Sequence, residues 1–208
     1  ESMKTSLIVT VLNEENSIGA FLDSILKQTR LPDEVVIVDG GSIDRTVAII
    51  KNHKSRIRNL KPIQGKGNRS VGRNVAIKNS TFDIIAVSDA GCILDKSWLA
   101  KITSPLNDKN IDVVAGYYKG KASSIFEKCL VPYVLVMPDR IDSNNFMPAS
   151  RSVAFRKSIW EKAGSFPEQL SHNEDYAFAK KLKEIRAMMV FEKDAIDYWI
   201  PKKNISEA

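Results

Sequence analysis

The chain has 208 residues, of which 43% are hydrophobic and 27% are charged, and its formal net charge is +6. This length and hydrophobic fraction predict one globular domain with a packed core, and the absence of an apolar run of about 18 residues argues against a membrane-spanning helix in this sequence. The basic residues are dispersed and no nucleic-acid-binding motif accompanies them, so we expect no nucleic acid as a partner.

The N-terminal segment and the cysteines indicate the compartment. Residues 6–12 (SLIVTVL) are strand-like, and we expect no signal peptide before them. Cys92 and Cys129 show neither a disulfide framework nor zinc-ligand spacing, so we predict free thiols in the core. Both features favour a cytoplasmic protein.

The first half of the chain alternates strand and helix patterns. Apolar, β-branched strand patterns occupy residues 6–12, 35–39, 57–63, 83–89 and 112–120. The helical patterns between them are predicted to start at Asn13, with Glu14 and Glu15 in the first turn, at Ser42 or Asp44, at Asn68 or Ser70, and at Asp95. Such alternation predicts an α/β fold with a mostly parallel central sheet and helices on both faces.

The second half is less regular. We predict a helix from residue 123 to Pro132 or beyond it, a strand over residues 150–155, and helices over residues 157–164 and 173–185, the last capped by Asn173. Met137, Phe146 and Met147 suit either a lobe that binds an apolar acceptor or the core, and we expect the core.

Polar side chains follow three of the predicted strands. Asn13, Asp39 and Asp89 each stand where an apolar strand ends. A single polar residue at such a position usually belongs to a turn or a cap, whereas ligands of parallel α/β sheets bind beyond the carboxyl ends of the strands. Three equivalent positions therefore predict a ligand-binding crevice at this edge of the sheet.

Five segments, taken in order, resemble one family. They are residues 9–29 (VTVLNEENSIGAFLDSILKQT), 34–46 (EVVIVDGGSIDRT), 72–91 (containing GRNVAI and DIIAVSDAG), 150–168 (SRSVAFRKSIWEKAGSFPE) and 173–182 (NEDYAFAKKL). Their order and spacing resemble the family-2 inverting glycosyltransferases of GT-A fold. The resemblance implies a single GT-A (Rossmann-like) domain, with a nucleotide-sugar-binding half over residues 3–119 and an acceptor-side half with the catalytic base over residues 120–208.

The resemblance implies a site for a nucleotide-diphosphate-sugar, with a UDP-sugar favoured and a GDP-sugar as the alternative. The residues implied for this site are Thr10, Leu12, Asn13, Glu14, Asp39, Gly41, Ser42, Lys66, Arg69, Arg73, Asn74, Asp89 and Ala90. The first seven would hold the nucleoside, and the basic side chains would neutralise the diphosphate. Two alternatives stay open: Asp39 and Ser42 only shape a turn, and Lys66 and Arg69 are plain surface residues.

Asp89 matches the first acidic residue of the family's D-x-D motif, and Gly91 stands where the second is usual. The resemblance implies a divalent metal ion, Mg²⁺ or Mn²⁺, held by Asp89 together with donor phosphates and waters. Asp95 and His172 are candidate further ligands, and each also suits a cap or a surface position.

Glu174 and Asp175 begin the last predicted helix, where the helix dipole favours ionised carboxylates. By resemblance, Asp175 is the general base that deprotonates an acceptor hydroxyl, and Glu174 orients it or touches the acceptor. Ordinary acidic enrichment of a first helical turn is the alternative. The implied function is transfer of a sugar to an acceptor hydroxyl with inversion, in cell-envelope polysaccharide biosynthesis.

The implied acceptor is a saccharide or a lipid-linked molecule at the inner face of the membrane. Related sequences continue after the segment that matches residues 195–208, so membrane association through a longer C-terminal part is an open alternative, as is contact of Lys202 and Lys203 with anionic lipid. Because Gly91 replaces an acidic ligand, a non-catalytic nucleotide-sugar-binding module also stays open. A nucleic-acid-binding protein and a nucleotidyltransferase lack their motifs here.

Overall fold

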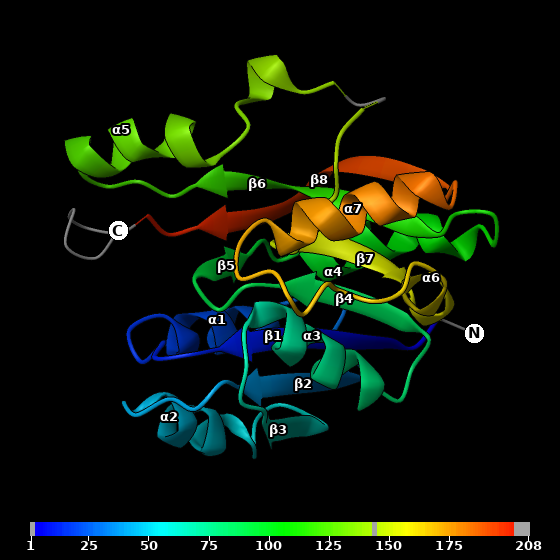
Figure 1. Ribbon diagram of the computed structural model, residues 1–208. Helices are drawn as coiled ribbons and strands as arrows, with labels where there is room; N and C mark the ends of the chain where they lie inside the picture. Colours follow the sequence, from blue (N-terminus) through cyan, green and yellow to red (C-terminus); the bar gives the residue numbers. More distant parts are fainter. Residues whose placement is uncertain (1–2, 143–144, 202–208) are drawn as a thin grey trace.

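A mixed β-sheet forms the centre of the molecule (Figure 1). The computed structural model describes residues 3–142 and 145–201. Within them the strands are β1 (Thr5–Val11), β2 (Glu34–Asp39), β3 (Leu60–Gln64), β4 (Ile84–Ser88), β5 (Cys92–Leu94), β6 (Val113–Gly120), β7 (Ser152–Arg156) and β8 (Met189–Trp199). Their order across the sheet is β3-β2-β1-β4-β7-β6-β8-β5.

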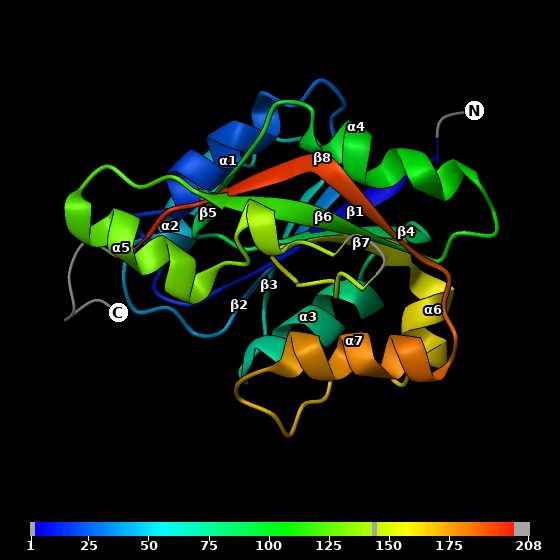
Figure 2. The ribbon, with the colours of Figure 1, turned by 90° about the horizontal axis from the view of Figure 1, so that it is seen from above.

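Helices cover both faces of this sheet. They are α1 (Ile18–Leu26), α2 (Thr46–His53), α3 (Arg69–Lys78), α4 (Trp98–Thr103), α5 (Ile125–Val134), α6 (Lys157–Lys162) and α7 (Glu174–Glu184), with 3₁₀ turns at Ser104–Asn107 and Pro138–Arg140. Seen from above, α1 and α4 lie on one side and α3, α6 and α7 on the other (Figure 2). In the described part of the chain, no helix has the length and apolarity needed to cross a bilayer.

The central strands β1, β2 and β4 are apolar on both faces because both faces are covered. Successive side chains of a strand point to opposite sides. Leu7 and Val9 of β1 accordingly pack with Phe21 of α1, whereas Ile8 packs in a second buried cluster with Phe178 of α7. This explains why β1, β2 and β4 could be predicted as continuous apolar runs.

The sheet is parallel on the side of the first half. β3, β2, β1 and β4 run parallel to one another, and β6 runs parallel to β8. β7 lies between β4 and β6 and is antiparallel to both, and β5 is antiparallel to β8. Parallel pairs are thus in the majority, as predicted, but the pattern did not predict β5, β8 or the direction of β7.

The predicted start of α1 is wrong. Asn13 does not cap this helix, which begins at Ile18 after a separate turn. In that turn the N–H groups of Ser17 and Ile18 donate to the Glu14 carbonyl at 3.0 and 2.9 Å. Asn13 itself has a φ of 54°, and this left-handed conformation is one that asparagine tolerates better than most residues.

The starts of α3 and α7 were both predicted, and they differ in how the preceding asparagine acts. The cap at α3 is confirmed, because Asn68 Oδ1 accepts a hydrogen bond from the Val71 N–H at 3.1 Å. Asn173 stands before α7 as predicted, but it is left-handed and its side chain makes no capping hydrogen bond. Its role in starting α7 is therefore one of backbone conformation.

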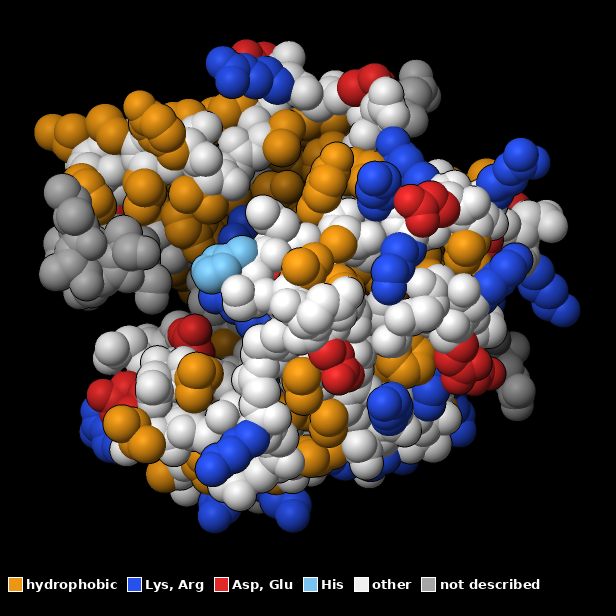
Figure 3. Space-filling view, in the orientation of Figure 1, with side chains coloured by type: hydrophobic (Ala, Val, Ile, Leu, Met, Phe, Trp, Pro, Cys, Tyr) orange, Lys and Arg blue, Asp and Glu red, His pale blue; other side chains and the backbone are white. Residues whose placement is uncertain are grey.

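The second half holds most of the unexpected features. α5 continues past Pro132 to Val134. Cys92 is buried as predicted, but Cys129 is exposed on α5, so its predicted core position is wrong. Hydrophobic side chains gather over α5 at the upper left of Figure 3. The tail residues Lys202 and Lys203 lie outside the described residues.

Candidate active site

Hydrogen bonds join the loops that follow β1 and β2. The Asn13 N–H donates to Ser42 Oγ at 2.8 Å, and Asn13 Oδ1 accepts from the Ile43 N–H at 3.0 Å. The Glu14 N–H donates to Thr46 Oγ1 at 2.7 Å. These bonds fix one rim of the crevice that the strand ends predict, and Asn13 and Glu14 line a cavity there.

Asp39 is turned into its own loop. Its side chain is buried, and its two carboxylate oxygens accept from the Ser42 N–H at 3.1 and 3.3 Å. Gly41, between them, has a φ of 108°, in the left-handed region that favours glycine. These are the contacts that the turn-shaping alternative requires, and a contact of Asp39 with a nucleoside stays a prediction.

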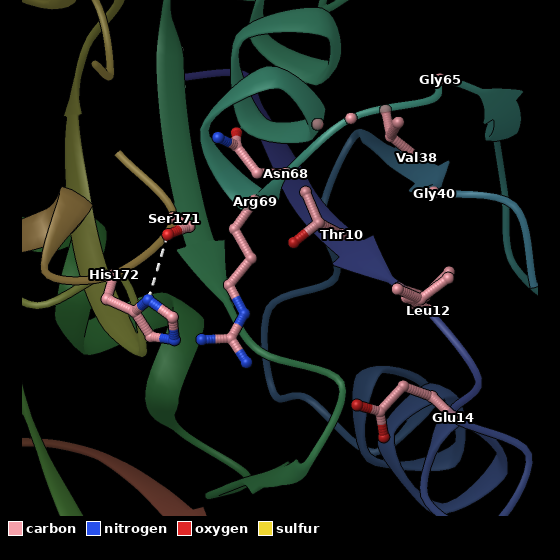
Figure 4. A pocket seen from close by; sticks show the side chains of 13 residues that line it. Thr10, Leu12, Glu14, Val38, Gly40, Gly65, Asn68, Arg69, Ser171 and His172 are labelled. Atoms are coloured by element: carbon pink, nitrogen blue, oxygen red, sulfur yellow. Dashed lines mark hydrogen bonds between the residues drawn. The ribbon is translucent and has the colours of Figure 1, made fainter. Parts of the chain in front are cut away.

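A cavity of about 340 Å³ opens between the ends of β1 and β2 and the start of α3 (Figure 4). Thr10, Leu12 and Glu14 line it from the β1 side. Arg69 extends across it toward His172, whose ring lies within hydrogen-bond distance of Ser171. The cavity thus combines an apolar wall with polar side chains from separate elements.

A second cavity, of about 610 Å³, lies beside the first. The two share Thr10, Glu14 and Arg69, and the second adds Asp89 and Arg151. A third, of about 320 Å³, also contains Arg69, Asp89 and Arg151 and reaches the start of α7. The three cavities therefore form one continuous region along the carboxyl ends of β1 and β4.

Arg73 ties the two halves of the chain together at this region. Its side chain is 3% exposed. Nη1 donates to Glu174 Oε1 at 2.6 Å, and Nη2 donates to Asp89 Oδ1 at 3.3 Å. The guanidinium also lies over the Phe166 ring, 5.6 Å from its centre. One buried cation thereby holds the predicted donor-side and acceptor-side carboxylates to a common wall.

Asn74, the neighbour of Arg73, has a structural position. Its Nδ2 donates to the Phe166 carbonyl and to Glu168 Oε1, both at 2.9 Å. Its Oδ1 accepts from Trp160 Nε1 at 3.2 Å and from the Phe166 N–H at 3.0 Å. The side chain is buried and lines none of the three cavities, so it holds the segment before α7 in place.

Glu174 and Asp175 have different environments although they are adjacent. Glu174 is buried against Arg73. Asp175 is only partly buried, its Oδ1 accepts from the Tyr176 N–H at 2.8 Å, and it lines the third cavity. Both residues line the third cavity, and Asp175 is the more exposed of the two carboxylates.

An apolar cavity of about 360 Å³ lies on the other side of Asp175. Tyr118, Phe146 and Met147 line it. The expected core position of Phe146 and Met147 is therefore corrected: both are partly exposed, and Phe146 packs on Phe191 with ring centres 4.3 Å apart. The surface next to the predicted base is aromatic.

Arg151 is a charged residue of the site that the sequence did not single out. It precedes β7, and its Nε lies 3.9 Å from Asp89 Oδ2. Its guanidinium lies over the rings of Tyr118 and Trp199, at 5.5 and 5.6 Å from their centres. The available signal was an arginine at the start of a short strand within a segment assigned to the acceptor side.

The remaining predicted residues fall at different places. Ala90 lines the second cavity beside Asp89. Lys66 is exposed and lines none of the three cavities, so its position suits the alternative of a plain surface residue. Asp95 accepts from the Ser97 N–H at 3.0 Å and from Ser97 Oγ at 2.7 Å, so it acts near the start of α4.

The donor set at Asp89 does not fit a metal ion held by the protein. Both oxygens of Asp89 face guanidinium groups, and Gly91 supplies no ligand. Within residues 3–142 and 145–201, no three His, Cys, Asp or Glu side chains are grouped so that they could hold a metal ion. Hard divalent cations prefer several oxygen ligands, and this site offers one carboxylate already paired with cations.

Asp197 of β8 is a second acidic residue that sequence reasoning missed. It is fully buried behind Asp89, and Ser88 Oγ donates to its Oδ2 at 2.5 Å. Burial, with a smaller contribution from the charge of Asp89, raises the pKa of Asp197 to about 7 although the Ser88 hydrogen bond opposes the shift. Asp197 therefore supports the end of β4 from within the core.

Comparisons with known proteins identify a family and related chains. The family model described as Glycosyl transferase family 2 matches residues 6–158. Glycosyltransferase AglE of Haloferax volcanii is 25% identical over 92% of this chain and 65% of its own length. Poly(ribitol-phosphate) beta-N-acetylglucosaminyltransferase TarP of Staphylococcus aureus is 27% identical over 76% of this chain and 50% of its own length.

Solved structures share the fold. S. aureus TarS 1-349 in complex with UDP-GlcNAc has a TM-score of 0.79 and 24% identity, covering 99% of this chain and 61% of that one. Mannosyltransferase PcManGT from Pyrobaculum calidifontis, in complex with GDP-Man and Mn²⁺, has a TM-score of 0.76 and 21% identity, covering 97% and 58%. The predicted GT-A fold is confirmed, and the chain spans about half to two thirds of the length of these relatives.

Proposed function

The chain belongs to glycosyl transferase family 2, and from this membership and the site geometry we propose that it moves a sugar from a nucleotide-diphosphate-sugar to an acceptor hydroxyl with inversion. The observation that carries the proposal is the Arg73 junction. It places Asp89, at the end of a donor-side strand, and Glu174–Asp175, at the start of an acceptor-side helix, on one cavity wall.

The donor would occupy the connected cavities. The first cavity, bounded by Thr10, Leu12 and Glu14, offers the apolar wall and polar groups that a nucleoside requires. The second and third, with Arg69, Asp89 and Arg151, would hold the diphosphate and the sugar. TarS and PcManGT were solved with UDP-GlcNAc and GDP-Man, and we favour a UDP-sugar with a GDP-sugar as the alternative.

Asp175 would act as the general base. A hydroxyl is a weak nucleophile until a base takes its proton. Glu174 is held by Arg73, so it cannot serve equally well, whereas Asp175 faces both the donor region and the apolar cavity. Proton removal by one carboxylate on the acceptor side supports direct displacement at the anomeric carbon, which inverts its configuration.

The acceptor would bind in the apolar cavity beside Asp175. Its aromatic lining of Tyr118 and Phe146 suits the apolar face of a sugar ring or of a lipid-linked saccharide. This assigns donor binding mainly to residues 3–119 and acceptor binding mainly to residues 120–208. Tyr118 is a contribution of the first half to the acceptor cavity, and Arg151 and α7 are contributions of the second half to the donor region.

Release of nucleoside diphosphate from a panel of UDP- and GDP-sugars tests the proposal. We expect release from members of one nucleotide class, accelerated by saccharide acceptors. Tight binding of a nucleotide without any release would instead favour the non-catalytic nucleotide-sugar-binding module that Gly91 keeps open. Absence of both binding and release would contradict the proposed function.

A further inference from the structure

The acidic centre of the donor region is enclosed by cations. Arg73 Nη2 lies 3.3 Å from Asp89 Oδ1, and Arg151 Nε lies 3.9 Å from Asp89 Oδ2. The other acidic residue that lines the second cavity, Glu14, accepts a hydrogen bond from Ser17 Oγ. A divalent cation at Asp89 would therefore lie beside two guanidinium groups, whose positive charge repels it.

Arg151 is held in a fixed position for an anionic ligand. Its guanidinium lies over the rings of Tyr118 and Trp199, and cation–π contacts of this kind restrain the group. Its Nε is buried and has no hydrogen-bond partner among the described residues. Arginine presents several donors in a planar fork that matches phosphate oxygens. Because Arg151 lines both the second and the third cavity, its side chain is placed to meet an anion there.

The neighbouring position is open. A Cβ added at Gly91 would meet no heavy atom within 4 Å, and Arg69, Asp89 and Arg151 line the same cavity. The space that a second acidic ligand would occupy is thus available to the ligand itself, in a cavity that two arginine side chains also line.

We propose that Arg151, together with Arg69, neutralises the diphosphate leaving group in place of a metal ion held by the protein. The inference rests on the proposed function and states which groups of the donor site balance the charge of the diphosphate. During transfer the bond between the anomeric carbon and the diphosphate oxygen breaks, and its electron pair stays on the diphosphate. The acceptor oxygen forms the new bond and its proton goes to Asp175, so the arginines only stabilise the charge that develops.

Calorimetric titration with UDP, GDP and uridine, in EDTA and in Mn²⁺, tests the inference on the unmodified protein. We expect the diphosphate to bind equally well in both solutions. A loss of diphosphate binding in EDTA that Mn²⁺ restores would overturn the inference and leave the proposed function standing. If no nucleotide binds in either solution, the proposed function fails, and the inference falls with it.

Substitutions test which side chain contributes to diphosphate binding. Arg151→Met should weaken binding of the diphosphate by about 10- to 100-fold, the loss typical of one charged hydrogen-bond partner, with uridine binding unchanged. Arg151→Lys should recover part of it, and Lys162→Met, which removes an exposed charge on α6, should change neither. Equal weakening of diphosphate and uridine by Arg151→Met would mean a purely structural role and would overturn the inference.

Gly91→Asp provides the converse test. Adding the carboxylate in open space should make diphosphate binding depend on Mn²⁺, because the site then has two acidic ligands. Unchanged binding of this variant in both solutions would count against the inference, since it would mean that a carboxylate at this position does not contact the diphosphate region.

Discussion

The two sides of the crevice are held in place in different ways. On the nucleotide side, backbone N–H groups and short polar side chains such as Asn13 and Ser42 join neighbouring loops. On the acceptor side, long charged side chains join elements that are far apart in the sequence, with Arg73 to Glu174 and Arg151 to Asp89. The nucleotide side is therefore fixed by several hydrogen bonds between neighbouring loops, and the acceptor side depends on a few charged pairs.

This difference leads us to expect that chemistry and binding can be separated. Asp175→Asn should lower the transfer rate about 10²- to 10⁴-fold, the usual contribution of a general base, and should leave nucleotide affinity unchanged. Glu184→Gln, at the exposed end of the same helix, is the matched control. Retained transfer in Asp175→Asn, measured as nucleoside diphosphate release, would mean that the base is elsewhere.

Breaking the link between the two sides should have the next largest effect. Arg73→Met should lower the free energy of unfolding by about 3 kcal/mol, because it leaves the buried Glu174 carboxylate unpaired. Denaturant unfolding measures this. The double variant Arg73→Met/Glu174→Met should recover much of the loss, whereas Arg69→Met, on an exposed side chain of the same helix, should change little. A double variant no more stable than the single one would show that the carboxylate is not the cause.

Alanine substitutions at two glycines test how closely the chain packs around each of them. A Cβ at Gly116 would lie 2.1 Å from Ser152 Oγ and 2.8 Å from the Ala195 carbonyl, and one at Gly72 would lie 2.7 Å from Thr10 Cγ2. Gly116→Ala should destabilise the protein by about 2 kcal/mol, and Gly72→Ala by less because a single side chain can move. Thermal unfolding checks the order, and the reverse order would contradict this account of the strand pairing.

The smallest effect concerns the buried Asp197. Burial raises its pKa to about 7 from 3.8, so the folded state binds a proton below about pH 7 that the unfolded state has already lost. Stability therefore falls as pH rises from about 4 through this pKa and levels off above it. The last part of this fall, between roughly pH 6 and pH 8, amounts to about 1.4 kcal/mol. Asp197→Asn should lack this decrease. Unfolding curves of both proteins that change in parallel with pH would contradict it.

The same contrast explains what could be predicted from the sequence. β1, β2 and β4 are apolar on both faces, so their residues identify them without knowledge of their partners. The roles of Asn13 and Asp39 were harder to assign, because a polar residue at a strand end serves equally as a cap, a loop contact or a ligand contact.

The acceptor-side half was less predictable because its features depend on distant partners. β8 carries Glu192, Lys193 and Asp194 in its middle, where its register with β6 shifts, so no apolar pattern marks it. The positions of Arg151 and Asp197 in the site depend on distant residues that pack around them, and no sequence pattern near either residue indicates these partners. Glu174 and Asp175 were found through the resemblance, since two acids at a helix start are ordinary alone.

The central claim is that the two sides meet in one site where Asp175 directs displacement with inversion. The most direct test follows the slow hydrolysis of an α-linked nucleotide sugar by proton NMR, which needs no known acceptor. If water replaces the acceptor at the same position, the β-anomer should appear first and then equilibrate. First appearance of the α-anomer would show retention and would contradict the claim.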